Sequence, residues 1–375
     1  MQYLWTHIRT LTDSYYGAVP FSHFIRNYTR QHPKLGSRDR KMLTTILYSW
    51  FRCSSGIVVP PQVANAFEVR VLACLRSCGV GGPAYDKLFA PFNIPDADVP
   101  PLKLENLFTE ALPLSEGISK EQWLLSMTRQ PRLFIRVIGS KDRICKVLNE
   151  NNILFEEVAP SCLALPNGTP IDKILPETDY AVQDASSQYT GTFFSPAAGQ
   201  QWYDCCCGAG GKSLLLMAEQ PAVRLTVTDK RASIINNLKE RFSRYGYRRP
   251  DALVADAADA AALSNTLGTR QFDNIICDVP CSGSGTWART PEPLHFFNSE
   301  VQQKFPPLQR AIAVNVSKYL RPGGRLIYIT CSVFRQENEE VVEHIVANTG
   351  LKVQHMQLIN GISILADSMF IAVLQ

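Results

Sequence analysis

Two cysteines in the last third of the chain stand where a reactive thiol could do chemistry. Cys281 lies in the string DVPCSGSGT (residues 278–286), and Cys331 lies in YITCS (residues 328–332). A lone cysteine is usually a small buried hydrophobic residue. Each of these two, however, follows a predicted strand and precedes a serine. Two thiols at neighbouring strand ends indicate nucleophilic catalysis.

Methylation of carbon 5 of a pyrimidine is a reaction that needs such a thiol, because C5 is a poor nucleophile. Addition of a thiolate at C6 makes C5 nucleophilic enough to accept a methyl group, and a base must then remove the C5 proton so that the thiol can leave. Methylation of a base nitrogen needs only a positioned lone pair, commonly held by an Asn/Asp-Pro-Pro-aromatic turn. Here the equivalent turn carries Cys281 and no aromatic residue.

A glycine-rich loop, DCCCGAGGKS (residues 204–213), follows the first strand of the predicted sheet. Its glycines let a ligand approach the backbone, and the helix that follows presents free N–H groups. A nucleoside-triphosphate loop needs glycine at the position of Cys206, so that class is excluded. A dinucleotide loop needs glycine where Ser213 stands, so that match is incomplete. The loop by itself leaves a dinucleotide and S-adenosylmethionine open.

Three carboxylates follow neighbouring strands of the same predicted sheet. Asp229 ends the second strand and suits a ribose hydroxyl, Asp256 follows the third and could accept from an adenine amine, and Asp278 ends the fourth. Open α/β sheets bind ligands outside the carboxyl ends of their strands. Each carboxylate alone could be a helix cap, but all three at one edge indicate a binding site.

The elements that position these residues alternate between strand and helix beyond Val182, which predicts a three-layer α/β domain with a parallel sheet. The predicted strands are Trp202–Cys206, Arg224–Thr228, Ala252–Ala255, Asn274–Cys277, Arg325–Thr330 and Met369–Leu374. The predicted helices are Ser213–Glu219, Ser233–Tyr245, Leu308–Leu320 and Glu337–Asn348, the third ended by the turn at residues 321–324.

The first part of the chain has a different pattern. Apolar residues at helical spacing predict helices at Arg40–Arg52 and around Val69–Arg76, while the Pro- and Gly-rich stretch 79–101 predicts loops. A small α/β module follows, with helices Glu121–Arg129 and Lys141–Asn149 and strands Leu133–Ile138 and Ile153–Val158. We therefore expect a helical region at 1–120, a small α/β module at 121–180 and a Rossmann-like domain at 181–375.

Composition narrows the class of protein. The 375 residues are 45% hydrophobic and 19% charged, which excludes a disordered polyelectrolyte. There is no run of 18 apolar residues and no signal-peptide layout, so we expect a cytoplasmic protein without a membrane partner. The 11 cysteines lack the spacing of a zinc site and suit reduced thiols, so no metal is expected. Basic runs within residues 1–60 and 230–249 favour a polyanionic partner.

The strings PCSGSGT (280–286) and TCS (330–332), the latter followed by QENE (336–339), resemble the two signature motifs of the Sun (Fmu)/NOL1/NOP family of RNA cytosine-5 methyltransferases. The tract VQDASSQ (182–188) and the loop 204–213 resemble its other motifs. GSRDR (36–40) and the helix after it resemble the NusB-like RNA-binding region of bacterial members. The resemblance implies a class I methyltransferase domain with a seven-stranded, parallel-rich sheet, preceded by a small RNA-binding α/β module and an all-α NusB-like region.

The resemblance also implies roles for individual residues. Cys331 would add to C6 of a cytosine, Cys281 would assist product release, and Asp278 would hydrogen-bond the base near N3. S-adenosylmethionine would be the cofactor, with its ribose at Asp229 and its adenine at Asp256. The other expected cofactor contacts are Asp278 and the loop residues Cys207, Gly208, Ala209, Gly210, Gly211 and Lys212.

Some positions depart from the family pattern or extend it. The family loop often reads CAAPGGK, whereas residues 206–212 lack the proline, and Ile234 stands where many members have an arginine. The segment Arg289–Glu292 matches the family's basic-x-Pro-acid segment beside the active site.

The expected partner is RNA in which the target cytosine is single-stranded or flipped out of its helix. The NusB-like region favours ribosomal RNA. A tRNA cytosine-5 methyltransferase and a non-catalytic ribosome-assembly factor remain alternatives, although the paired cysteines argue against the second. The oligomeric state stays open, with a monomer favoured.

Overall fold

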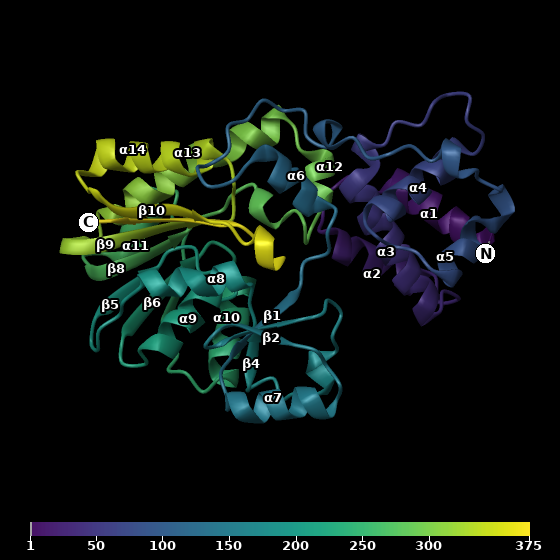
Figure 1. Cartoon of the computed structure of the whole chain (residues 1–375). Coiled ribbons are helices and arrows are strands. Elements are labelled where there is room, and N and C mark those ends of the chain that lie inside the picture. Colours follow the sequence, from purple (N-terminus) through teal and green to yellow (C-terminus); the bar gives the residue numbers. More distant parts are fainter. Residues whose placement is uncertain (1) are drawn as a thin grey trace. The chain divides into compact units, whose positions relative to one another are not determined.

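The computed structural model describes residues 2–375, apart from the side chain of Ser299 (Figure 1). The chain divides into two units. The first, here the helical unit, contains residues up to 111 with 119–130 and 286–298, and the second, the sheet unit, contains 112–118, 131–285 and 299–375. The three domain ranges expected from the sequence remain a prediction. No helix in residues 2–375 is long and apolar enough to cross a membrane.

The helical unit is built from α-helices whose apolar faces form its core. Leu4 and Ile8 pack with Leu43, Ile46 and other buried side chains, and this spacing is the helical pattern that the sequence shows. The helices are α1 (Gln2–Ser14), α2 (Phe21–Gln31), α3 (Ser37–Cys53), α4 (Ala66–Ser77), α5 (Pro83–Phe89), α6 (Lys120–Met127) and α12 (Glu292–Phe296).

The expectation of loops throughout 79–101 is wrong, because α5 lies inside this stretch. Pro83 occupies the first turn of the helix, where its missing N–H costs nothing, and Gly82 before it has a φ of 110° that suits glycine. Leu88 and Phe89 are buried and give the short helix its packing.

The sheet unit contains a seven-stranded sheet with the order β10-β11-β9-β8-β5-β6-β7. Strands β5 to β9 run parallel, and β11 is antiparallel to β9 and β10. The predicted parallel-rich sheet is therefore confirmed. Its strands are β5 (Gln201–Asp204), β6 (Arg224–Asp229), β7 (Asp251–Val254), β8 (Phe272–Asp278), β9 (Leu320–Thr330), β10 (Val353–Ile359) and β11 (Met369–Leu374).

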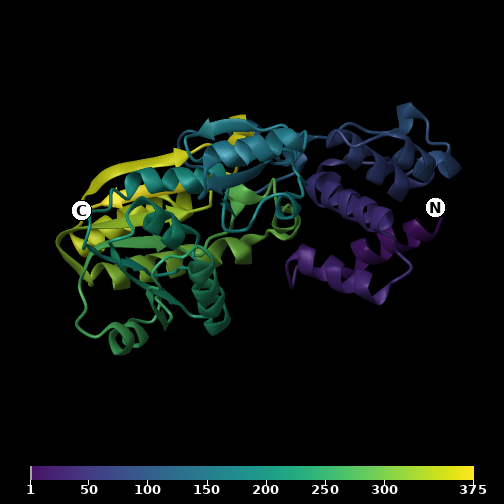
Figure 2. The same cartoon turned by 90° about the horizontal axis from the view of Figure 1, so that it is seen from below.

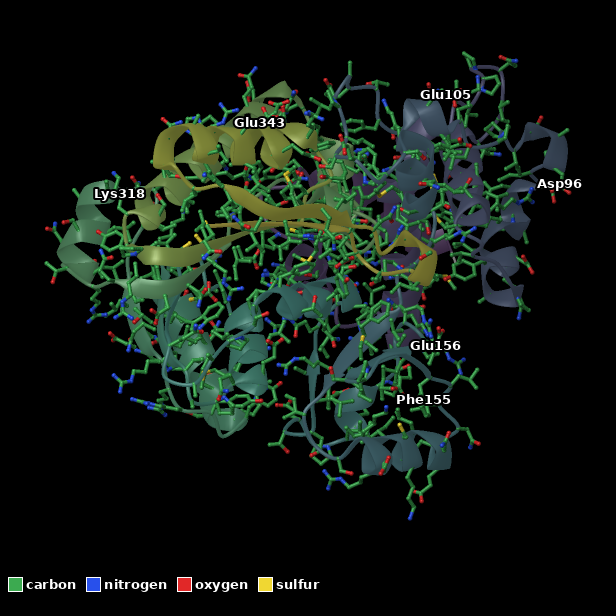
Figure 3. All side chains as sticks on the ribbon, turned by 60° about the vertical axis from the view of Figure 1, so that its left-hand side comes forward. Asp96, Glu105, Phe155, Glu156, Lys318 and Glu343 are labelled. Carbon is green, nitrogen blue, oxygen red and sulfur yellow. The ribbon has the colours of Figure 1, made fainter. Side chains whose placement is uncertain are left out.

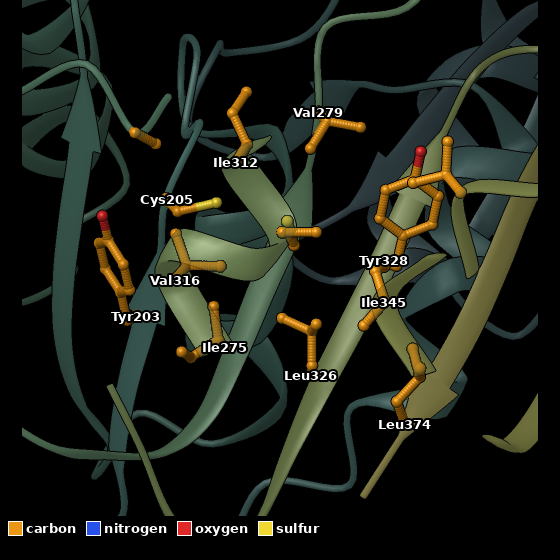
Figure 4. Packing of buried hydrophobic residues seen from close by; sticks show 14 of the residues in the cluster. Tyr203, Cys205, Ile275, Val279, Ile312, Val316, Leu326, Tyr328, Ile345 and Leu374 are labelled. Carbon is orange, nitrogen blue, oxygen red and sulfur yellow. The ribbon is translucent and has the colours of Figure 1, made fainter. Parts of the chain in front are cut away.

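Helices cover both faces of this sheet (Figures 1 and 2). One face packs on α9 (Gly211–Glu219) and α10 (Ala232–Arg244). The other packs on α11 (Ala260–Leu267), α13 (Ser299–Ser317) and α14 (Glu339–Thr349). Figure 4 shows the second core, in which strand residues such as Tyr203 and Ile275 meet Ile312 and Val316 of α13. This three-layer arrangement holds the strand ends, and with them the candidate site, on a rigid base.

The bounds of α13 differ from the predicted helix Leu308–Leu320. The helix begins at Ser299, so that Pro306 and Pro307 lie inside it, where each proline removes a helical hydrogen bond. It ends at Ser317 because the chain enters β9 at Leu320, and the predicted turn 321–324 is part of that strand.

A second, four-stranded antiparallel sheet in the same unit has the order β2-β3-β1-β4 and carries α7 (Lys141–Glu150). Its strands are β1 (Leu133–Val137), β2 (Glu156–Ala159), β3 (Cys162–Leu165) and β4 (Tyr180–Val182), and α8 (Ala185–Tyr189) follows β4. Glu156, labelled in Figure 3, lies on the edge strand β2 with Glu157. Charged side chains on an edge strand hinder pairing with another chain.

Candidate active site

The two cysteines meet at the carboxyl ends of adjacent parallel strands. Asp278 is the last residue of β8 and is in register with Ile329 of β9, so Cys281 and Cys331 leave the sheet side by side. Their Sγ atoms are 3.2 Å apart. The structure thus brings together the three residues to which catalytic roles were assigned from the sequence.

Glu337 ties the two cysteine loops together. Its carboxylate is buried, and its Oε2 accepts hydrogen bonds from the backbone N–H of Ser282 (2.8 Å) and from Nε2 of Gln309 (3.0 Å). Its Oε1 accepts from the hydroxyl of Ser332 at 2.8 Å. Ser282 follows Cys281 and Ser332 follows Cys331, so one carboxylate fixes the residue after each thiol. Glu337 lies in the QENE motif (336–339), from which no role for it could be predicted.

A close backbone approach adds to this link. The N–H of Gly285 donates to the carbonyl of Cys331 at 2.9 Å, and the N–H of Ser368 donates to the carbonyl of Gly285 at 2.9 Å. A Cβ atom at position 285 would lie 2.0 Å from the carbonyl oxygen of Ser368. Gly285 is therefore required because the space beside it leaves no room for a side chain.

The Cys281 thiol holds its proton firmly. The hydrogen bond with Cys331 raises the pKa of the Cys281 thiol well above its ordinary value, and burial and the negative charge of Glu337 act in the same direction. Cys281 therefore keeps its proton near neutral pH and can donate a hydrogen bond across the 3.2 Å contact. A thiolate is the nucleophilic form of cysteine, so the raised pKa argues against Cys281 as the nucleophile.

Asp278 is held by a buried lysine from the glycine-rich loop. Lys212 Nζ lies 3.2 Å from Asp278 Oδ2 and donates to Ser187 Oγ at 2.9 Å. Gln183 Nε2 donates to the same hydroxyl at 3.2 Å, and Arg136 Nε donates to Gln183 Oε1 at 3.0 Å. A continuous polar chain thus runs from the small sheet to the candidate catalytic carboxylate.

The glycine-rich loop makes a tight turn from β5 into α9. Gly210 has a φ of 84°, and α9 begins at the next residue. Ser213 donates its hydroxyl to Asp204 Oδ2 at 2.6 Å, and burial raises the pKa of Asp204 to about 7. The loop is thus anchored beneath the strand ends by a buried carboxyl group.

A cavity of about 380 Å³ opens beside this loop, and Asp229, Asp256 and Asp278 all line it. Its other walls include Cys205, Cys206, Pro280, Phe305, Leu308 and Ile312. The loop residues 207–212 are not among the lining residues, although the N–H of Gly208 bonds to the carboxylate of Asp229. Acceptor carboxylates around an apolar space fit a ligand with hydroxyl and amine donors on a flat apolar ring, as in an adenosine group.

The carboxylate of Asp229 is already held by its neighbour Arg231. The guanidinium donates from Nε to Oδ1 and from Nη2 to Oδ2, each at 3.0 Å. Burial alone would raise the pKa of Asp229, but the hydrogen bonds from Arg231 lower it overall. A carboxylate has about four lone-pair sites, and Asp229 also accepts from the backbone N–H groups of Arg231 (2.9 Å) and Gly208. A ligand hydroxyl would therefore have to share or displace one of these four donors.

The segment Arg289–Glu292 belongs to the helical unit, where Glu292 is buried and accepts the N–H of Phe21, and its role beside the active site stays a prediction. Within residues 2–375, no group of three or more His, Cys, Asp or Glu residues is placed to hold a metal ion.

The strand order and the cavity at the carboxyl ends of β5 to β8 define a class I methyltransferase fold. Residues 191–368 match the family described as 16S rRNA methyltransferase RsmB/F. The matched residues, which contain both cysteines, place this part of the chain in that family, the Sun/Fmu group.

Known proteins show the extent of the likeness. Ribosomal RNA small subunit methyltransferase B of Shewanella oneidensis is 31% identical over 189 residues, which cover 50% of this chain and 43% of that protein. The chain therefore spans about half the length of the curated relatives it matches. The crystal structure of PH0851 has a TM-score of 0.70 at 20% identity and covers 93% of both chains. NSun6 from Pyrococcus horikoshii has a TM-score of 0.60 at 16% identity and covers 72% of this chain and 96% of its own. At these identities the two structures support the fold.

Proposed function

We propose that this chain transfers a methyl group from S-adenosylmethionine to C5 of a cytosine in RNA, with the small-subunit ribosomal RNA as substrate. The observation that carries the proposal is the 3.2 Å contact between the Cys281 and Cys331 sulfurs at adjacent strand ends. Methylation of a nitrogen or an oxygen has no use for a thiol pair. The names of the curated relatives support the choice of ribosomal RNA.

Cys331 is the nucleophile in this proposal. Its thiolate adds to C6 of the cytosine, which moves the ring electrons to C5, and C5 then takes the methyl group. A base removes the C5 proton, the C5–C6 double bond re-forms, and the bond between Cys331 and C6 breaks. Cys281 assists this last step because its S–H is placed to hydrogen-bond the departing sulfur.

Asp278 orients the base. In this proposal it hydrogen-bonds the cytosine near N3, which favours protonation of the ring and makes C6 more electrophilic. Lys212 fixes the carboxylate from the side of the loop, and Ser187 fixes Lys212. Lys212 is buried, and the partly exposed carboxylate of Asp278 gives its ammonium the partner that a buried charge requires.

The cofactor cavity accounts for the three strand-end carboxylates. Asp229 would accept from the ribose hydroxyls and Asp256 from the adenine amine, while Phe305 and Leu308 supply apolar walls. Asp278 lines the same cavity and also contacts Lys212, so cofactor and target base meet at this residue. The cofactor would supply the methyl group, and Asp278 and Pro280 of the cavity wall belong to the segment that leads into Cys281.

Substitution of each thiol tests the two roles. Cys331→Ala should abolish methyl transfer, while Cys281→Ala should accumulate a covalent protein–RNA adduct that survives denaturing electrophoresis. Cys145→Ala, a change on α7 outside the site, is the matched control and should behave like the wild type. An adduct that forms in Cys281→Ala and persists after Cys331 is also replaced would overturn the assignment.

The substrate is tested by bisulfite sequencing of total RNA from cells with and without the protein. Loss of one 5-methylcytosine from small-subunit ribosomal RNA is expected. Loss of a 5-methylcytosine from a tRNA would instead identify tRNA as the substrate. Unchanged methylation throughout would favour a non-catalytic assembly factor.

A further inference from the structure

The basic run at residues 230–249 is divided between two edges of the large sheet. Lys230 and Arg231 line the cofactor cavity at the carboxyl edge. Helix α10 then runs back across the sheet for 13 residues, which is about 20 Å at 1.5 Å per residue. Arg248 and Arg249 therefore lie at the amino edge, far from the thiols. Neither arginine has a role in the proposed methyl transfer.

These two arginines belong to a groove of about 420 Å³ at the amino edge. Its wall contains the first residues of four parallel strands: Gln201, Arg224, Asp251 and Phe272. The groove, here the arginine groove, is lined by five exposed arginines: Arg224, Arg248, Arg249, Arg270 and Arg321.

The arginine groove carries an excess of positive charge. Arg270 pairs with Asp251 at 2.5 Å, and Arg321 pairs with Asp273 at 2.7 Å. Arg249 donates to the neutral hydroxyl of Ser243. Across residues 2–375, the structure gives the side chains of Arg224 and Arg248 neither an ion pair nor a hydrogen bond. Two carboxylates thus face five guanidinium groups, and none of the five arginines is buried in the core.

We propose that the arginine groove binds phosphate groups of the RNA backbone, at a segment distant from the cytosine that reaches Cys331. Guanidinium groups match phosphate oxygens in a two-pronged geometry, and several of them around one hollow suit a polyanion better than a single anion. The inference rests on the proposed function, since it takes the substrate RNA as the polyanion.

The position of the groove also constrains the substrate. An RNA that reaches both edges of the sheet must span about 20 Å along α10. A folded ribosomal RNA can present two segments at that separation, whereas a short oligonucleotide centred on the target cytosine engages one site at a time. The arginine groove therefore favours a structured substrate over a short one.

The test is the salt dependence of binding to transcribed 16S ribosomal RNA, measured by filter binding from about 50 to 300 mM KCl. Each lost phosphate contact should reduce the slope of log K against log salt by about 0.7 to 0.9. Arg224→Ala with Arg248→Ala should reduce it by about 1.5 and weaken binding roughly ten-fold or more near 0.1 M salt. The matched control is Lys352→Ala, an exposed cation at the same edge but beside β11.

An unchanged slope in the variant with Arg224→Ala and Arg248→Ala would overturn the inference. A Lys352→Ala variant whose slope falls by as much per removed charge would overturn it too. Arg224→Lys with Arg248→Lys keeps the charge and should retain most of the slope. The binding measurement needs no methyl transfer. A wild-type protein that fails to methylate the RNA but shows the groove-dependent slope would refute the proposed function and leave the arginine groove standing.

Discussion

Replacement of Glu337 is the sharpest perturbation of the thiol pair, because this carboxylate bonds to the residue after each cysteine. Glu337→Gln keeps the volume of the side chain and removes its charge. The side-chain oxygen of the glutamine can still accept the bonds that were made to one carboxylate oxygen. Its NH2 group replaces the other carboxylate oxygen, and the donors on that side lose their acceptor. Glu337→Ala removes all the acceptors.

The size of the effect follows from the three donors that the carboxylate satisfies, which come from Ser282, Ser332 and Gln309. A buried donor left without a partner costs about 1–3 kcal/mol. The Ser332 hydroxyl can rotate to another partner, whereas the N–H of Ser282 is fixed. We therefore expect Glu337→Gln to lower the free energy of unfolding by about 1–3 kcal/mol and Glu337→Ala by about 3–5 kcal/mol.

The charge has a separate readout in thiol reactivity. The hydrogen bond with Cys331 and burial do most to raise the pKa of Cys281, and the carboxylate of Glu337 adds to them. Removal of this charge should therefore lower that pKa and increase the thiolate fraction at a given pH. Alkylation of Cys281 by iodoacetamide, followed by peptide mass spectrometry between pH 6 and 9, should therefore become faster in Glu337→Gln, with its profile moved toward lower pH.

The control for both readouts is Glu343→Gln. Glu343 is an exposed glutamate on α14, labelled in Figure 3, and lies 3.7 Å from Arg335. It should change neither stability beyond about 0.5 kcal/mol nor the alkylation profile. If Glu337→Gln is less stable but its Cys281 is alkylated with the wild-type pH profile, the expected effect of the Glu337 charge on the pKa of Cys281 is refuted. Only the role of Glu337 as a hydrogen-bond acceptor then stands.

Two further substitutions test other parts of the site. Gly285→Ala should destabilise the fold by about 3 kcal/mol or more in urea unfolding, because its Cβ would lie 2.0 Å from the Ser368 carbonyl oxygen; wild-type stability would contradict this contact. Burial raises the pKa of Asp204 to about 7, so its stabilising contribution is full below about pH 4 and is lost as the pH rises through 7. Asp204→Asn, which can still accept from Ser213, should flatten the fall in stability between pH 5 and 8; an unchanged pH dependence would contradict the raised pKa.

The parallel core of the sheet was predictable because its strands contain short apolar or β-branched stretches that end in polar residues. Leu225–Thr228 of β6 and Ile275–Cys277 of β8 are such stretches, and each is followed by an aspartate. Strand β10, Val353–Ile359, was not predicted, since an edge strand with mostly exposed residues carries no such run. Helix α5 was hidden by its flanking prolines and glycines, which mark both loops and helix starts.

The residues of the candidate site that are marked by short sequence motifs were predictable. Cys281, Cys331 and the three strand-end carboxylates each follow a strand, and parallel strands place their ends at one edge. The partners of Glu337 could not be read in the same way. Gln309 comes from α13, and its contact with Glu337 depends on how that helix packs on the sheet. The meeting of the arginines in the groove depends likewise on the length of α10 and on strand order.

Two identical thiols 3.2 Å apart could in principle exchange roles, so something must decide which one keeps the proton. The hydrogen bond with Cys331, burial and the charge of Glu337 all raise the pKa of the Cys281 thiol, and this links the behaviour of two variants. If the Cys281 S–H helps the Cys331 sulfur to leave, a lower pKa at Cys281 should slow that departure as the pH rises. Glu337→Gln should then accumulate part of the covalent RNA adduct expected for Cys281→Ala, more at pH 9 than at pH 7. An adduct level that is independent of pH would mean that Cys281 assists release without donating a hydrogen bond.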